Sequence, residues 1–73
     1  MAYKKEVNNM DNNSPPLHKL VALRHYKREM ERHPKQSIEY ETNKLAYLTI
    51  IHVLEIRKYN IPFGFREYAR EIE

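Results

Sequence analysis

Apolar residues recur at spacings of three and four along most of the chain, and proline-containing breaks divide them into segments. The first segment begins where Ser14 can cap free backbone N–H groups and where proline is tolerated in the first turn of a helix. It ends at His33-Pro34, because a residue before proline is pushed out of the helical region and proline cannot donate to the preceding turn. The pattern predicts a first helix over 15–32.

The second apolar segment is the longest, and it contains neither glycine nor proline. Ser37 can cap its start, and acidic residues fall in the first turn, where the helix dipole favours negative charge. Arg57 and Lys58 fall in the last turn of a helix that we predict over 38–59, where positive charge is favoured. β-branched residues dominate 48–53, so a strand over these residues is the competing interpretation.

A third segment follows a break at 60–64, which holds a proline and the only glycine of the chain. We predict a short helix over 65–72, with apolar residues gathered on one side of it. Phe63 and Phe65 flank the glycine and form an apolar knuckle with Ile61. This knuckle either holds the third helix on the second or inserts into a partner.

The first thirteen residues are polar and rich in asparagine. Such a segment has too little apolar surface to offset the entropy of ordering, so it is expected to be a disordered tail. The predicted organisation is a flexible tail over 1–13 and one all-α domain over 14–73. That domain is predicted to contain two longer antiparallel helices, followed by a short C-terminal helix.

Composition narrows the function classes. The chain has 73 residues, no cysteine, and a net charge of +3 with both signs mixed. A domain this small buries a modest fraction of its surface and often relies on oligomerisation for stability. No apolar run suits a signal peptide or a membrane span, so we expect a cytoplasmic protein without membrane contact. The abundant asparagine, lysine and isoleucine are compatible with an AT-rich coding sequence, as in low-GC bacteria, their phages or mobile elements.

The second predicted helix is apolar on almost all sides, and such a helix must be covered on all sides. One broad side carries Leu48, Ile51 and Leu54, another carries Leu45, Ile56 and Tyr59, and two short neighbours cannot shield both. We therefore expect a homodimer or a protein partner, the alternative being a monomer with scattered exposed apolar residues. The candidate partner-binding residues are Tyr47, Ile51, Leu54, Phe63, Phe65 and Tyr68.

A basic strip lies on the first predicted helix. Arg24, Arg28 and Arg32 are spaced by four, and Lys27 lies nearby, so their side chains can meet phosphates along one side. The alternative interpretation is a solvated face that is partly paired internally, for example through Lys27 and Glu31. Nucleic-acid binding by this strip is the second function class.

Residues that carry chemistry are sparse. His25, Glu29 and His33 have the spacing of metal ligands on one helix face, but no further ligand is suggested elsewhere, so we expect no metal. His52 is expected to be a hydrogen-bonded residue of the core or an interface. The sequence contains no glycine-rich phosphate loop, nucleophile elbow or HExxH pattern. We therefore expect a non-enzymatic protein without cofactor or small-molecule substrate, which acts as a regulator, adaptor or inhibitor by binding a protein.

Overall fold

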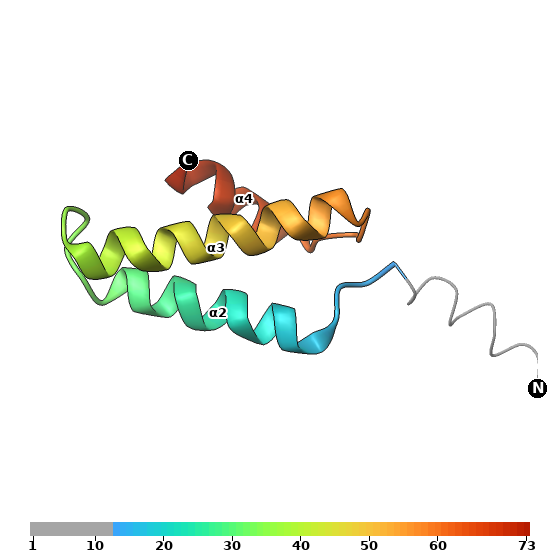
Figure 1. Cartoon of the computed structure of the whole chain (residues 1–73), viewed down its shortest axis with the longest axis horizontal. Helices are drawn as coiled ribbons and strands as arrows, with labels where there is room; N and C mark the ends of the chain where they lie inside the picture. The colour runs from blue at the N-terminus through green and yellow to red at the C-terminus, as the bar shows by residue number, and fades with distance from the viewer. Residues whose placement is uncertain (1–12) are drawn as a thin grey trace, which may run out of the picture.

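The computed structural model describes residues 13–73, which form three α-helices. These are α2 (Leu17–Glu31), α3 (Ile38–Ile56) and α4 (Phe63–Ile72). α2 and α3 run antiparallel side by side, and α4 folds back along α3 (Figure 1). The predicted all-α fold of two longer helices and a short third one is confirmed. The strand alternative over 48–53 is wrong, because these residues continue α3 without interruption.

One hydrophobic core lies where the three helices meet. The inner face of α3 supplies half of it, because its four buried residues recur at intervals of seven, four and three and therefore share one side of the helix. α2 adds two residues seven positions apart, and α4 adds the small side chain of Ala69. The buried core residues are Leu23, Met30, Tyr40, Tyr47, Ile51, Leu54, Ile61 and Ala69.

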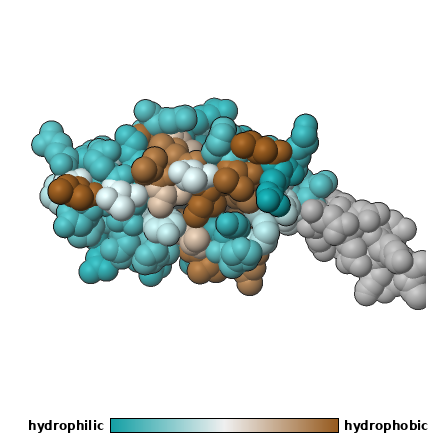
Figure 2. All heavy atoms as spheres, in the orientation of Figure 1, coloured by the Kyte–Doolittle hydropathy of each residue, from teal (hydrophilic) through white to brown (hydrophobic). Residues whose placement is uncertain are grey.

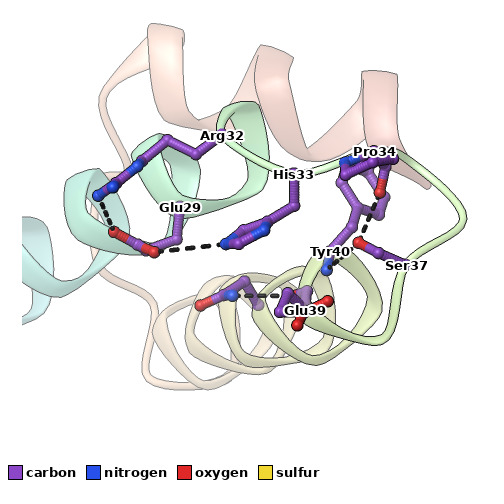
Figure 3. A network of polar contacts seen from close by, with 8 residues as sticks. Glu29, Arg32, His33, Pro34, Ser37, Glu39 and Tyr40 are labelled. Atoms are coloured by element: carbon purple, nitrogen blue, oxygen red, sulfur yellow. Dashed lines mark hydrogen bonds and ion pairs between the residues drawn. The ribbon is translucent and has the colours of Figure 1, made fainter.

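Ser37 fixes the start of α3. Its Oγ accepts a hydrogen bond from the Tyr40 N–H at 3.1 Å and donates one to the Pro34 carbonyl at 2.7 Å (Figure 3). The predicted cap is therefore confirmed. A single hydroxyl ties the turn before α3 to its first backbone amides, which would otherwise lack partners.

Glu29 organises the end of α2. One of its carboxylate oxygens lies 3.2 Å from Arg32 Nη1, and the other lies 3.8 Å from His33 Nε2 (Figure 3). Both partners follow it by three or four residues, which places them on the same side of the helix end. The contacts of Glu29 thus lie at the end of α2, and those of Ser37 lie at the start of α3. Together they flank the short link that joins these two antiparallel helices.

The start of α2 differs from the prediction. The helix begins at Leu17, and Pro16 occupies the N-cap position with an extended backbone (φ −59°, ψ 143°). Ser14 therefore lies two residues before the cap, and no side chain caps this helix. The Pro16 carbonyl begins the helical hydrogen bonding, accepting from Lys19 N at 3.0 Å and from Leu20 N at 3.3 Å.

The end of α3 also differs, since the helix stops at Ile56 rather than Tyr59. Lys58 has a positive φ of 61°. Its N–H donates to the Glu55 carbonyl, and the Tyr59 N–H donates to the Leu54 carbonyl, both at 3.0 Å. This pair of bonds is a Schellman motif, which usually has glycine at the left-handed position. The motif turns Tyr59 back against the core, where burial of its ring offsets the backbone cost at lysine.

The N-terminal boundary of the fold lies slightly earlier than predicted. The Asn60 N–H donates to the Asn13 carbonyl at 2.6 Å, so the segment before α2 is joined to the segment before α4. Asn13 thus belongs to the described fold, although the sequence places it in the tail. The remainder of the predicted tail, 1–12, lies outside the described residues.

Tyr47 holds α4 in place. Its hydroxyl donates to the Phe65 carbonyl at 3.0 Å, and its ring meets the Tyr68 ring edge to face, with centroids 5.2 Å apart. Lys27 Nζ lies 4.7 Å from the centre of the Tyr68 ring, which links α2 to the same cluster through a cation–π contact. Burial raises the pKa of Tyr47 above its ordinary value near 10, and the neighbouring Tyr68 raises it further. All three helices therefore meet at this tyrosine pair.

Candidate interaction surface

The six residues predicted to bind a partner are distributed over the core and the surface. Tyr47, Ile51 and Leu54 lie in the core, with exposed fractions of 0%, 5% and 1%. Phe65 and Tyr68 are partly buried and pack against that core. These five positions hold the chain's own helices together, so a partner has little access to them without separating the helices.

The apolar knuckle between α3 and α4 is split in the same way. Ile61 is buried and Phe65 packs against the core, so these two residues hold α4 on α3. Phe63, by contrast, is 74% exposed. Of the six predicted partner-binding residues, Phe63 alone projects fully from the described surface.

A different set of apolar side chains is exposed on α3. Ile38, Leu45 and Ile56 have exposed fractions of 81%, 68% and 63%. Leu45 and Ile56 belong to the side that the sequence leaves without cover, whereas Ile38 is a further member that sequence reasoning did not single out. On α2, Leu17 and Val21 are also exposed, at 75% and 54%, so the α3 set is distinguished by its number and its shared side of the helix.

These three residues belong to a continuous line of exposed positions, which we call the outer seam. Along the seam, intervals of four and three residues alternate, so successive members drift little around the helix axis. This alternation, with its mean of about 3.5 residues, is the signal of a coiled-coil contact face and was present in the sequence. The outer seam consists of Ile38, Thr42, Leu45, Thr49, His52 and Ile56, and every one of them is exposed.

The outer seam lies opposite the core. With roughly 100° of rotation per residue, the seam positions cluster on one side of α3 and the buried positions on the other. Figure 2 shows apolar and neutral side chains along α3 with hydrophilic ones beside them, and further apolar side chains below, over the start of α2. α2 and α4 occupy the remaining flanks of α3, and the described residues include no further helix to cover the seam.

Charged residues flank the two ends of the seam with opposite signs. Glu39 and Glu41 are exposed near the start of α3, and Arg57 and Lys58 are exposed just after its end. Glu55 lies nearer the positive end, but its carboxylate is paired with an arginine of α4 at 3.2 Å. Within α3 and its C-terminal turn, the seam therefore runs from a negative end to a positive end, and Lys35 is exposed in the link before it.

The basic strip on α2 is divided between free and engaged side chains. Arg24 and Arg28 are exposed, and within residues 13–73 neither has a carboxylate at ion-pair distance. Arg32 is paired with Glu29, and Lys27 lies over the Tyr68 ring rather than beside Glu31. Two of the four predicted phosphate contacts are thus already used inside the fold.

In the described part of the chain, the histidines do not form a metal centre. Across residues 13–73, no group of three or more histidine, aspartate or glutamate side chains is close enough to hold a metal ion. His52 was expected in the core or an interface, and the structure places it on the exposed seam. None of the helices described here has the length and apolar character needed to cross a membrane.

Comparisons with protein families, curated proteins and solved structures find no match to this chain. The surfaces that can bind a partner are therefore the outer seam and the basic strip.

Proposed function

We propose that this chain is a non-enzymatic helical interaction module that binds a protein through the outer seam of α3. The observation that supports it is the exposure of Ile38, Leu45 and Ile56, at 63–81%, in register with a coiled-coil repeat. Covering these side chains removes apolar surface from water, which is the main favourable term in protein association. The module acts by occupying a surface of its partner protein, as a regulator, adaptor or inhibitor does.

The seam is suited to specific recognition as well as to affinity. Its aliphatic residues are separated by Thr42, Thr49 and His52, whose polar groups need matching partners when they are buried. A partner helix with apolar residues at all six levels would leave these groups unsatisfied. Polar residues within an apolar contact face select partner and register in this way.

A binding assay with one matched control tests this function. The chain is immobilised, and the proteins of a host lysate that it retains are compared with those retained by Leu45→Glu and Val21→Glu. Val21 is also an exposed aliphatic residue, 54% exposed, but it lies on α2 and outside the seam. Retention that survives Val21→Glu and is lost in Leu45→Glu supports the proposal, and equal retention by all three overturns it.

A second candidate function is nucleic-acid binding through α2, favoured by the free guanidinium groups of Arg24 and Arg28. Both line a groove between α2 and α4 together with Lys27 and Phe65, although Glu31 lines the same groove. Phosphate contacts by such a groove are strongly salt-dependent, because each releases counterions. Binding to single- and double-stranded DNA and RNA is measured across salt concentrations, and Arg24→Glu with Arg28→Glu should abolish it. An absence of binding at low salt removes this candidate.

A further inference from the structure

We propose that the outer seam is covered by a second copy of this chain, with the two α3 helices antiparallel. This inference rests on the proposed function and names the occupant of the same surface. The symmetry of the seam, the charges at its two ends and the length of α3 all favour this occupant.

The seam is complementary to itself when it is reversed. Antiparallel pairing about a two-fold axis at the level of Tyr47 sets Ile38 opposite Ile56 of the second copy, so that the most exposed aliphatic residue meets another one. Both ends of the contact are closed by such a pair. Because a two-fold contact uses the same surface on both chains, every apolar contact occurs twice.

The middle of the seam contains one polar level and one mixed level. At the next level inward, Thr42 faces His52 of the second copy, and a hydroxyl and an imidazole can hydrogen-bond to each other. At the centre, Leu45 faces Thr49 of the second copy, which offers a methyl group beside its hydroxyl. Reversal therefore places polar opposite polar at the Thr42–His52 level and isoleucine opposite isoleucine at the ends. At the central level, the Thr49 hydroxyl faces leucine and is left to bond to a backbone carbonyl of its own helix.

The end charges select the antiparallel direction. In this direction Glu39 and Glu41 of one chain lie near Arg57 and Lys58 of the other, and the two helix dipoles oppose each other. A parallel pair would instead bring the glutamates of both chains together and the basic residues of both chains together. Glu55 adds little repulsion, because its carboxylate is already paired on its own chain.

The length of α3 sets the strength of the contact. Its 19 residues, at about 1.5 Å per residue, give a seam of about 28 Å. With a helix about 10 Å wide, two such faces cover on the order of 600 Å², which is small for a specific interface. We therefore expect a reversible dimer with a dissociation constant in about the micromolar range.

Sedimentation equilibrium of the full chain between about 1 and 200 µM tests the dimer. The expected result is a monomer–dimer equilibrium that Leu45→Glu shifts at least ~100-fold towards monomer and that the matched Val21→Glu leaves within ~3-fold. Both substituted positions are exposed, so neither variant loses core packing. A monomer at all concentrations overturns the proposal, as does a series of larger species, which would indicate head-to-tail contacts between unlike surfaces.

Disulfide trapping tests the direction, because the chain contains no cysteine of its own. Ile38→Cys and Ile56→Cys are prepared separately and then mixed in a glutathione redox buffer. The antiparallel pair predicts a mixed disulfide between the two variants as the dominant product. Homodisulfides of each variant alone, formed as readily as the mixed one, would overturn the antiparallel arrangement.

The two proposals fail in distinguishable ways. If the chain is monomeric by sedimentation while a different host protein is retained in a Leu45-dependent manner, the second copy is wrong and the interaction module stands. If the chain is monomeric and no retention depends on Leu45, both proposals are wrong.

Discussion

The two faces of α3 have similar aliphatic content and opposite surroundings. On the inner face, Tyr40, Tyr47, Ile51 and Leu54 are at most 8% exposed, whereas the isoleucine and leucine residues of the outer seam are at least 63% exposed. Both sets recur at helical spacing, so neither is distinguished by periodicity alone. Burial on this helix is decided by what packs opposite each face, which a helix's own sequence does not specify.

The inner face is covered because two neighbours converge on it. α2 and α4 both pack against α3. On that side, the Tyr47–Tyr68 contact joins α4 to α3, and Lys27 over the Tyr68 ring joins α2 to α4. Each neighbour is shorter than α3, and together they cover the core side and the flanks. The difference between the faces therefore predicts that substitutions on the inner face affect folding and those on the outer seam affect association.

The largest effect is expected from Leu54→Glu, which places a carboxylate in the core. Leu54 is 1% exposed, and an unpaired buried charge costs several kcal/mol. A domain of this size has only about 3–5 kcal/mol of stability, so the variant should be unfolded at room temperature. Circular dichroism should show loss of the helical signal. A folded Leu54→Glu monomer would contradict the assignment of the inner face to the core.

The helices were predictable because their signals are local. Ser37 lies where a cap is needed, proline ends α2, and the apolar spacing spans the whole of α3. The end of α3 was not predictable, because the Schellman motif at Lys58 depends on Tyr59 finding cover in the folded core. The failure at Ser14 has a similar origin, since the two following prolines keep the chain extended for two more residues.

The candidate site was less predictable than the fold. The sequence indicates an excess of apolar surface on α3, and it correctly leaves Leu45 and Ile56 without cover. It does not show which side of α3 is covered by α2 and α4, so it predicts partner binding at Tyr47, Ile51 and Leu54, which the structure places in the core. Ile38 completes the outer seam and could have been found from the alternation of four- and three-residue intervals.

The tyrosines of the core make folding sensitive to alkaline pH. Burial raises the pKa of Tyr68, with further contributions from Glu31, Tyr40 and Glu71, and the pKa of Tyr47 is raised as well. A tyrosine whose pKa is higher in the folded than in the unfolded chain contributes stability below its unfolded pKa, and that stability is lost as pH rises further. The melting temperature should therefore be nearly constant up to pH ~10 and fall above it.

The measurement is thermal unfolding followed by circular dichroism at a series of alkaline pH values. Tyr47→Phe is the matched variant, because it keeps the ring and removes the ionisable hydroxyl together with its hydrogen bond to Phe65. It should melt lower at neutral pH, by the equivalent of about 1 kcal/mol, and lose less stability above pH ~10. An identical alkaline decline in both proteins would show that other groups cause it.

Lys58→Gly should stabilise the chain without altering either face of α3. Lysine at a φ of 61° carries a backbone cost that glycine lacks, so we expect a gain of about 0.5–1 kcal/mol and a melting temperature higher by about 3–6 °C. Arg57→Gly is the control, because Arg57 has a φ of −84° and should lose stability when it is replaced. Equal losses in both variants would mean that the left-handed turn is not formed in solution.

The smallest effect on folding is expected at the centre of the outer seam. Leu45 is 68% exposed in the single chain, and leucine and glutamate have similar helix propensities, so Leu45→Glu removes little packing and no backbone preference. Glu41 lies one turn earlier, and the added like-charge pair costs only a few tenths of a kcal/mol on an exposed helix. Measured below the concentration at which the chain dimerises, the free energy of unfolding should therefore stay within about 1 kcal/mol of the parent value. At higher concentration the two proteins should diverge, because association stabilises only the chain that still dimerises. A large loss at low concentration would show instead that Leu45 supports the monomer, and the contrast between the two faces of α3 would then be wrong.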